Sequence, residues 1–322
     1  MIASIQPGDW LRYIGEEYLT TFIGDGGSAI KFAVPMDDGL RSDLFDGLAA
    51  IGDQAGYLVV KINAAETKVN MVDEIFFRTA EQIPWHILSR KVIAKLAAES
   101  GYSWVDCGDG PLYRHLADEN QVDPQMLLLD LKKSIGNKVF KHRNLSKDFR
   151  VAMTHLCIAE LSGGQDGTTT IKVLTEWLTG RNKAMSAVKP FQIFRKINRA
   201  TARYFFESLL HWVRLAGYPG VVIVMDAQRV MLARNPHDLG LFYSKAAVLD
   251  TYEVLRQFID AADQLDGCFI TVVPDIAFLE DLGRGIRRYE ALMFRVFDEI
   301  RDKHLVNPMA SLVRISATVQ KT

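Results

Sequence analysis

Two residues far apart in the chain have the types and surroundings needed to hold a nucleotide and its metal ion. Ser42 begins an expected helix directly after a short strand and a tight loop, a position from which a hydroxyl can ligate Mg²⁺. Asp226 follows the apolar run of residues 221–225, where a carboxylate would hold Mg²⁺ directly or through water. Together they predict a phosphate-binding loop and the acidic residue that works with it.

The loop before Ser42 departs from the Walker A motif G-x-x-x-x-G-K-[ST] at each defined position except the last. Pro35 takes the place of the first glycine and has no N–H to offer to a phosphate oxygen. Leu40 replaces the second glycine, whose missing side chain allows close backbone approach, and Arg41 replaces the compact lysine ammonium with a planar fork. On its own, this stretch is more simply a strand, a turn and a helix.

The strand that ends in Asp226 also lacks a residue that ATP hydrolysis uses. Ala227 stands where a glutamate would polarise the attacking water, and loss of such a base lowers a rate by about 10²–10⁴. Asp226 itself and Gln228 are the candidates for a catalytic role. Gln228 and Glu253 are the two possible substitutes for the missing base, and the spacing supports neither. The residues expected to hold ATP and Mg²⁺ are Arg41, Ser42 and Asp226, with the metal on Asp226 and Ser42.

Helices and strands must position these residues, and their periodicity can be followed along the chain. Asp9 is the expected N-cap of an amphipathic helix that ends at the glycines of residues 24–27. There follow a strand at residues 30–34, a helix at residues 42–55 closed by Gly56, and a second buried strand at residues 57–62. Strand, helix and strand in so short a stretch make a βαβ unit, which implies a parallel sheet with a right-handed crossover.

The middle of the chain has a different character, and the sheet resumes after it. Helical periodicity covers residues 83–98, 125–140 and 149–161, with a loop at residues 163–170. Next come a long helix at residues 190–215, a strand at residues 220–226, a helix at residues 246–264, and strands at residues 268–273 and 311–315. We therefore expect an α/β core formed by residues 1–65 and 181–322, interrupted by a helical insertion at residues 66–180.

The composition is that of an ordinary globular protein with an uneven charge distribution. In 322 residues, 38 basic side chains balance 39 acidic ones and 48% are apolar, so composition alone indicates neither a nucleic-acid nor a membrane partner. Acidic residues outnumber basic ones before Gly56, whereas residues 181–203 contain no acidic residue. This asymmetry predicts a polarised surface.

Cysteine usage and the apolar runs favour the cytoplasm. Cys107, Cys157 and Cys268 are far apart and form no C-x-x-C pair, which argues against a disulfide framework or a zinc site. The N-terminus has no basic segment followed by an apolar core, and the longest apolar runs are too short to span a bilayer. We expect a cytoplasmic protein with reduced thiols and no membrane partner.

Residues 161–165 read Leu-Ser-Gly-Gly-Gln and match the signature of ABC transporters letter for letter. In transporters this motif begins a helix. Here it closes a predicted helix and is followed by the loop composition of residues 166–170. We therefore reject the match.

Two clusters of basic residues are candidates for nucleic-acid contact. The first consists of Lys132, Lys133, Lys138, Lys141, Arg143, Lys147 and Arg150, and the second of Arg181, Lys183, Lys189, Arg195, Lys196, Arg199 and Arg203. Both fall on expected helices, so solvated helix faces are the simpler interpretation. The second cluster is interleaved with aromatic residues that fit a core equally well. The alternative is nucleic-acid binding through Arg195, Lys196, Arg199 and Arg203.

A third group of basic residues follows the strand at residues 268–273. Arg287, Arg288 and Arg295 lie in a region from which an arginine of ring-forming ATPases reaches the nucleotide of a neighbouring subunit. Surface arginines on an ordinary helix are the simpler interpretation.

Several short stretches, taken in order, resemble the ATP-binding proteins of BREX phage-defence systems, the BrxC/BrxD type of AAA-like P-loop ATPase. They are residues 14–19 (IGEEYL), 27–32 (GSAIKF), 197–203 (INRATAR), 216–220 (AGYPG), 255–260 (LRQFID) and 289–292 (YEAL). Each stretch is short, and it is their order along most of the chain that carries the resemblance.

The resemblance implies an AAA+/ORC-like P-loop NTPase core with ATP and Mg²⁺ as cofactors, in a cytoplasmic anti-phage complex of a type that often handles DNA. On this basis Ser42 would be the Walker A hydroxyl and Asp226 the Walker B acid. The arginine acting on a neighbour would be Arg287, Arg288 or Arg295. Little chain remains after the last strand for a lid or winged-helix domain.

Because both nucleotide motifs depart from the family pattern, we expect a pseudo-ATPase that acts by assembly. Its partners would be other defence proteins, such as an active paralogous ATPase, in a homo- or hetero-oligomer. Two alternatives stay open. One is an atypical ATPase that uses Arg41 for phosphate and completes its site in an oligomer, and the other is a DNA-binding adaptor.

Overall fold

The computed structural model describes residues 4–105, 111–297 and 307–317, so Cys107 lies outside the described residues. The chain forms two units, one of Met1–Thr79 with Tyr218–Thr322 and one of Ala80–Gly217. Within the described ranges, no helix combines the length and the apolar character that crossing a membrane requires. Cys157 and Cys268 are free thiols, and burial raises the pKa of both.

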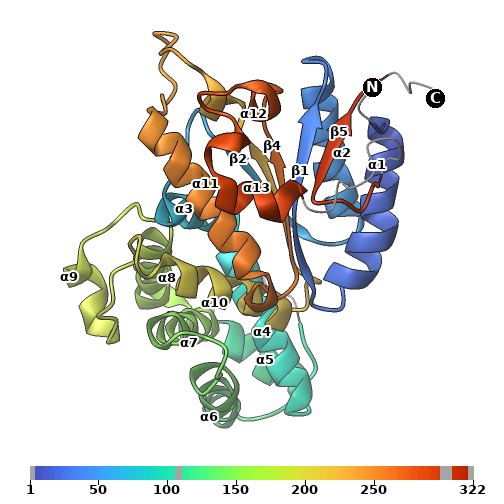
Figure 1. The fold of residues 1–322 in the computed structure, drawn as a ribbon. Helices are drawn as coiled ribbons and strands as arrows, with labels where there is room; N and C mark the ends of the chain where they lie inside the picture. Colours follow the sequence, from blue (N-terminus) through green and yellow to red (C-terminus); the bar gives the residue numbers. More distant parts are fainter. Residues whose placement is uncertain (1–3, 106–110, 298–306, 318–322) are drawn as a thin grey trace. The chain divides into compact units, whose positions relative to one another are not determined.

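The first unit is built on a five-stranded sheet in which every pairing is parallel (Figure 1). The strands are β1 (Ser28–Pro35), β2 (Leu58–Asn63), β3 (Val221–Asp226), β4 (Cys268–Val273) and β5 (Leu312–Ile315). The predicted strands are confirmed, and their order in the sheet is β2-β3-β4-β1-β5. The side chains of β3 and β4 are almost all buried because both faces of the sheet are covered.

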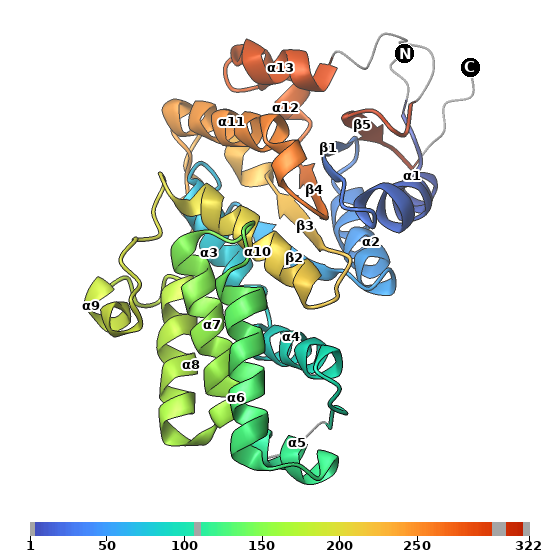
Figure 2. The ribbon, with the colours of Figure 1, turned by 90° about the horizontal axis from the view of Figure 1, so that it is seen from below.

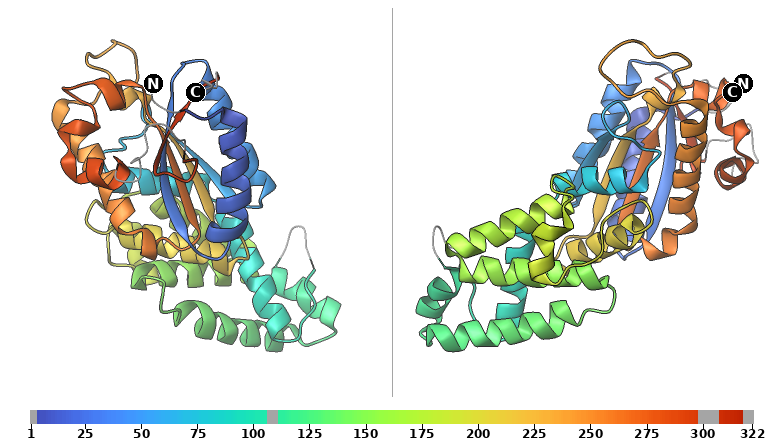
Figure 3. Two further views of the ribbon diagram at one scale, coloured as in Figure 1. Left: turned by 45° about the vertical axis from the view of Figure 1, so that its right-hand side comes forward. Right: turned by 90° about the vertical axis from the view of Figure 1, so that its left-hand side faces the viewer.

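Helices cover both faces of this sheet (Figure 3). The helices on one face are α1 (Pro7–Tyr13), its π-helical continuation η1 (Ile14–Ile23) and α2 (Leu40–Gln54). Those on the other face are α11 (Lys245–Asp260), α12 (Ala277–Glu280) and α13 (Glu290–Phe297). Asp9 is not the N-cap, because α1 begins two residues earlier with Pro7 at its first position.

The strand order explains how distant residues meet. β1 and β2 are joined through α2 but do not pair, because β4 and β3 lie between them. The prediction that β2 is buried is wrong, since β2 is an edge strand with Lys61 and Asn63 exposed. All strands run in the same direction, so their carboxyl ends share one edge of the sheet, where ligands of open α/β sheets bind.

The second unit is entirely helical in its described part (Figure 2). Its longer helices are α4 (Trp85–Glu99), α5 (Leu112–Asn120), α6 (Pro124–Ile135), α7 (Lys147–Ser162), α8 (Gly164–Leu178) and α10 (Ala202–Leu215). Shorter turns are η2 (Gly136–Phe140), α9 (Met185–Val188) and η3 (Lys189–Phe191). α7 is central to this unit, and Phe149 on α7 packs against Trp85 and Phe205.

The loop predicted at residues 163–170 is wrong, because α8 begins at Gly164 directly after α7 ends. Gly163 makes the turn with φ 58° and ψ −155°, a conformation that side chains oppose. Gly167 lies against the preceding helix, where a Cβ atom would come within 2.8 Å of the Ala159 carbonyl oxygen. The Leu-Ser-Gly-Gly-Gln stretch therefore both closes one helix and opens the next, and the packing of a helical hairpin accounts for its glycines.

The long helix predicted at residues 190–215 is also wrong. The 3₁₀ turn η3 ends at Phe191, Gln192 takes a left-handed conformation (φ 62°), and α10 begins only at Ala202. The Asp148 carboxylate accepts the backbone N–H groups of the two residues after Ile193, at 2.8 and 2.9 Å. These hydrogen bonds hold the segment in a non-helical path.

Candidate functional site

The first part of the candidate site is the turn between β1 and α2. β1 ends at Pro35 and α2 begins at Leu40, so residues 36–39 form a tight turn at the carboxyl end of the strand. Arg41 and Ser42 lie in the first turn of α2. The strand, loop and helix expected here are confirmed.

Several backbone N–H groups around this turn are already hydrogen-bonded within the protein. Pro35 has no N–H, and the N–H of Met36 donates to a β5 carbonyl at 2.8 Å. The N–H groups of Leu40 and Arg41 donate back into the turn at 3.1 and 3.3 Å. The turn also contains the exposed acids Asp37 and Asp38. A phosphate cradle needs successive N–H groups directed at the anion, and those of Met36, Leu40 and Arg41 are already used within the protein.

The second part of the site is the end of β3. Asp226 is the last residue of that strand, its side chain is 22% exposed, and its Oδ1 accepts the N–H of Gln228 at 3.0 Å. Ala227 is buried, so the position after the acid offers no polar group. The side chain of Gln228 is an amide, which is not a base at neutral pH.

Arg41 joins these two parts. Its Nη1 lies 3.4 Å from Asp226 Oδ1 and donates to the Val273 carbonyl at 3.0 Å, and its Nη2 donates to the Pro274 carbonyl at 3.1 Å. The Arg41 side chain is only 12% exposed. The guanidinium therefore lies over the carboxyl ends of β3 and β4 and supplies the positive charge beside Asp226.

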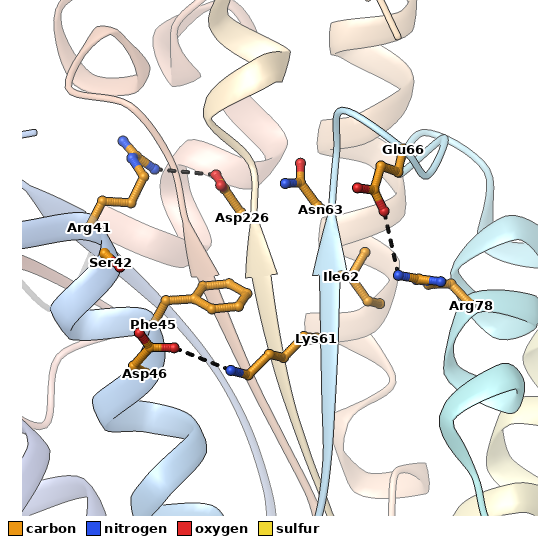
Figure 4. A pocket seen from close by; sticks show the side chains of 10 residues that line it. All are labelled: Arg41, Ser42, Phe45, Asp46, Lys61, Ile62, Asn63, Glu66, Arg78 and Asp226. Atoms are coloured by element: carbon orange, nitrogen blue, oxygen red, sulfur yellow. Dashed lines mark hydrogen bonds and ion pairs between the residues drawn. The ribbon is translucent and has the colours of Figure 1, made fainter. Parts of the chain in front are cut away.

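A pocket of about 420 Å³ opens beside this ion pair (Figure 4). Two further ion pairs lie on its walls, Lys61 with Asp46 at 3.3 Å and Arg78 with Glu66 at 3.5 Å. The pocket is lined by Arg41, Ser42, Phe45, Asp46, Lys61, Ile62, Asn63, Glu66, Arg78 and Asp226. Arg41, Ser42 and Asp226, which the sequence singled out as nucleotide-binding residues, are thus brought together.

Asn63 is a polar residue of this pocket that sequence reasoning missed. It ends β2 in register with Asp226 on the neighbouring strand, and its Oδ1 accepts the N–H of Ala65 at 2.8 Å. The available signal was a polar residue directly after an apolar strand, the same signal that identified Asp226. Parallel strands bring two such residues to one edge.

One oxygen of Asp226, the expected ligand of Mg²⁺, is already engaged by other groups. Asp226 Oδ1 is occupied by Arg41 and by a backbone N–H, so a metal ion there would meet a guanidinium. In the part of the chain that the structure describes, no three His, Cys, Asp or Glu side chains group as metal ligands. Ser42 lines the same pocket but offers a single hydroxyl.

Glu253 is not placed to serve as the missing base. It lies on α11 and does not line the pocket. Its carboxylate accepts from Arg256 at 2.7 and 2.8 Å and from the Tyr289 hydroxyl, and these hydrogen bonds lower the pKa of Glu253 to about 2. A carboxylate so stabilised in its charged form is a weak proton acceptor.

The three candidate trans-acting arginines lie outside the pocket lining. Arg295, on α13, pairs with Asp260 of α11. Arg287 and Arg288, in the short turn η6 (Ile286–Arg288), are exposed, and no carboxylate in the described ranges pairs with either. These two remain available to a partner.

The candidate nucleic-acid residues lie in the second unit. Arg195, Lys196 and Arg199 are exposed on the non-helical segment before α10, whereas Arg203 on α10 pairs with Glu207 at 3.0 Å. Phe194 is 65% exposed and Tyr204 is 53% exposed, and the neighbouring Phe205 is buried. The aromatic residues of this cluster thus divide between the surface and the core.

The parallel sheet, the turn that leads from β1 into α2, and the acid at the end of β3 define a P-loop NTPase-like α/β protein. A family model described as the BREX system ATP-binding protein BrxC/D matches residues 114–321, and the chain belongs to this family. The BREX system is a multi-protein phage-defence system, and the family name describes an ATP-binding component of it. No curated protein and no solved structure matches the chain.

Proposed function

We propose that this chain is a BREX subunit that has kept the fold of an ATP-binding AAA+-like protein and no longer hydrolyses ATP. It would act in the cytoplasm by assembling with other defence proteins, one of them an active ATPase of the same family. The family match supports the place in the defence system, and the geometry of the site supports the loss of hydrolysis.

The observation that carries the proposal is the hydrogen bonding of Arg41. Its guanidinium takes three acceptors, the Asp226 carboxylate and the carbonyls of Val273 and Pro274. A side chain held by three acceptors at 12% exposure is poorly available to a phosphate, and it neutralises the carboxylate that would otherwise attract a metal ion.

Two further departures from the nucleotide-binding motifs also support the loss of ATP hydrolysis. Pro35 removes an N–H from the turn, and Ala227 removes the side chain that would activate water. Because the losses fall in two motifs far apart in the sequence, within a sheet whose strands are intact, the fold is kept for a reason other than chemistry.

ATP turnover by the pure protein tests this proposal. We expect that the protein without a partner hydrolyses no Mg–ATP above background, at low or at high protein concentration. Turnover above about 0.1 s⁻¹ that disappears in Asp226→Ala would overturn it, since that rate approaches the ordinary enzyme range. Activity that appears only on oligomerisation or with a partner, and that needs Arg41, would establish instead an atypical ATPase with a shared site.

The exposed aromatic residues of the second unit support one alternative, a DNA-binding adaptor. Phe194 offers a ring for base stacking, and Arg195 and Lys196 follow it with positive charge. The backbone N–H groups of Phe194 and Arg195 donate to the Asp148 carboxylate, and these hydrogen bonds hold the two residues in a fixed conformation. Stacking on a fixed ring is how single-stranded nucleic acid is bound without sequence preference.

Binding of a labelled single-stranded oligonucleotide at several salt concentrations tests the alternative. We expect a salt-dependent affinity that falls in Phe194→Ala and in the double variant Arg195→Glu with Lys196→Glu. Lys172→Glu changes the charge of an exposed lysine on α8 of the same unit and is the control. Binding that the double variant leaves unchanged would count against the adaptor.

A further inference from the structure

The guanidinium of Arg41 lies among three oxygen atoms at the carboxyl edge of the sheet. One is a carboxylate oxygen, Asp226 Oδ1, at 3.4 Å from Arg41 Nη1 (Figure 4). The other two are the backbone carbonyl oxygens of Val273 and Pro274, at 3.0 and 3.1 Å from the guanidinium nitrogens. Carboxylate and carbonyl oxygens are also the ligands that hard divalent cations take in proteins. This edge therefore forms a set of cation ligands, and the cation that they hold belongs to the chain itself.

The register of the strands explains why these oxygens converge. Asp226 and Val273 are opposite each other on the paired strands β3 and β4, and Pro274 follows directly. The N–H of Ala227 donates to the Val273 carbonyl at 3.0 Å, which holds the two strand ends together. Arg41 reaches them from the first turn of α2. All these residues belong to the first unit, so one rigid neighbourhood supplies both the oxygens and the cation.

A divalent ion at Asp226 would have to compete with this cation. The Arg41 side chain is only 12% exposed, and a guanidinium is always protonated in proteins. A metal ion beside the guanidinium would be repelled by it, and a metal ion that displaced it would leave a buried charge without its acceptors. Because Arg41 is part of the chain, its local concentration also exceeds that of any dissolved ion.

The rest of the pocket does not favour a metal ion either. Its two other acids, Asp46 and Glu66, pair with Lys61 and Arg78. The lining as a whole contains three acidic and three basic side chains. A divalent ion would bring two positive charges into a lining whose own charges already balance.

We infer that the Arg41 guanidinium takes the place of the divalent metal ion at this edge of the sheet. It holds α2, β3 and β4 in one arrangement whether or not Mg²⁺ is present. This inference rests on the proposed function, because a subunit that hydrolysed ATP would need the metal ion here. In switching nucleotide-binding proteins the metal ion and the terminal phosphate order the surrounding loops. Here a side chain does so, and the subunit keeps one conformation while an active partner goes through its cycle.

Binding of Mn²⁺ to the whole chain, followed by the loss of the EPR signal of free Mn²⁺, tests the inference without nucleotide. The unaltered chain should bind no Mn²⁺ up to about 1 mM, the weak end of the range of cation sites in proteins. Arg41→Ala removes the guanidinium and leaves the three oxygens, so it should bind Mn²⁺ at least about tenfold more tightly. The double variant Arg41→Ala with Asp226→Asn should lose this gain.

Thermal unfolding gives a second measurement of the same site. A metal ion that binds only the folded state stabilises it, so saturating Mn²⁺ should raise the unfolding midpoint of Arg41→Ala by about 2–4 °C. The midpoint of the unaltered chain should not change with Mn²⁺. Arg41→Lys keeps a cation at this position and should also be insensitive to Mn²⁺, which separates loss of charge from loss of packing.

The matched control is Arg229→Ala. Arg229 is 11% exposed, pairs with Asp238 and donates to the Leu241 carbonyl at 2.6 Å, so its removal also releases a carboxylate and a carbonyl. Asp238 is 51% exposed, and no strand register brings further oxygens to it. This variant should gain no Mn²⁺ site. An equal gain in Arg229→Ala and Arg41→Ala would overturn the inference, because any released carboxylate would then be enough.

Mn²⁺ binding by the unaltered chain that disappears in Asp226→Asn would also overturn the inference, and this result needs no variant of Arg41 to fold. So would an Arg41→Ala protein that unfolds cooperatively and binds no more Mn²⁺ than the unaltered chain. ATP turnover is measured separately. Turnover would overturn the proposed function, whereas Mn²⁺ binding by the unaltered chain without turnover would overturn this inference alone.

Discussion

Arg41 and Asp226 form an ion pair of 3.4 Å between residues 185 positions apart in the chain. The pair lies at the carboxyl edge of the sheet where β3 and β4 end, because the same guanidinium also donates to the carbonyls of Val273 and Pro274. The contribution of this ion pair to the free energy of unfolding can therefore be measured by replacing Arg41.

Replacing Arg41 with methionine should destabilise the first unit. The substitution keeps the length of the side chain but leaves a carboxylate and two carbonyls without their donor, which should lower the free energy of unfolding by about 2 kcal/mol. Urea unfolding measures the change. The control is Arg12→Met, whose pair with Asp9 is more than half exposed, and which should cost under about 0.5 kcal/mol. Equal costs for the two variants would show that Arg41 is not a structural group.

Replacing each of two glycines of the helical unit with alanine should change the stability of the unit in opposite directions. Gly167→Ala places a Cβ atom 2.8 Å from the Ala159 carbonyl oxygen, so a backbone must move and the unit should lose about 1–3 kcal/mol. Gly136→Ala meets nothing within 4 Å and should stabilise the helix by up to about 1 kcal/mol. Thermal unfolding compares them. A neutral Gly167→Ala would contradict the close contact between α7 and α8.

Asp148→Ala should loosen the segment before α10. The carboxylate accepts two backbone N–H groups, those of Phe194 and Arg195, and their loss should cost about 1–2 kcal/mol. Hydrogen exchange at residues 192–196 should become faster. Asp166→Ala, an exposed acid in the first turn of α8, should leave this exchange as it was. Unchanged protection in Asp148→Ala would mean that other contacts fix the segment.

The helical unit should be less stable in mild acid. Burial lowers the pKa of His155, and burial together with the charge of His211 lowers the pKa of His142. The unfolded chain then binds protons that the folded unit does not. The free energy of unfolding should therefore be greatest above about pH 6.5 and decrease as the pH falls below that value. Urea unfolding at several pH values gives the slope.

His155→Gln should reduce this slope, because it removes one of the two half-buried imidazoles. His115→Gln replaces an exposed histidine of α5 and is its control. A slope of the same size in both variants would place the pH dependence elsewhere in the chain.

The sequence predicted the parallel sheet and predicted that polar residues at the carboxyl ends of its strands lie close together. Continuous apolar runs followed by a polar residue are a strong signal for buried parallel strands. The hydrogen bonds of Arg41 could not be predicted, because two of its acceptors are backbone carbonyls that any residue would supply. Asn63 carried the same signal as Asp226 and needed only the strand order to be placed beside it.

The two wrong predictions of secondary structure, the loop at residues 163–170 and the helix at residues 190–215, also have physical causes. The glycines at positions 163 and 164 resemble a loop in sequence, but one glycine turn is enough to reverse a helix when a third glycine allows close packing. The segment after Phe191 has helical periodicity, but hydrogen bonds to Asp148, far away in sequence, override it. In both places a tertiary contact decided the local structure.

The order of the strands also matters while the protein is being made. β2 leaves the ribosome without a partner, because the whole Ala80–Gly217 unit must be synthesised before β3 appears beside it. At about 5–20 residues per second that delay is roughly ten seconds or more. β1 waits longer, since its partners are β4 and β5. α1, η1 and α2 are made before these partner strands, and the negative charge of their carboxylates should repel the same segment of a neighbouring nascent chain.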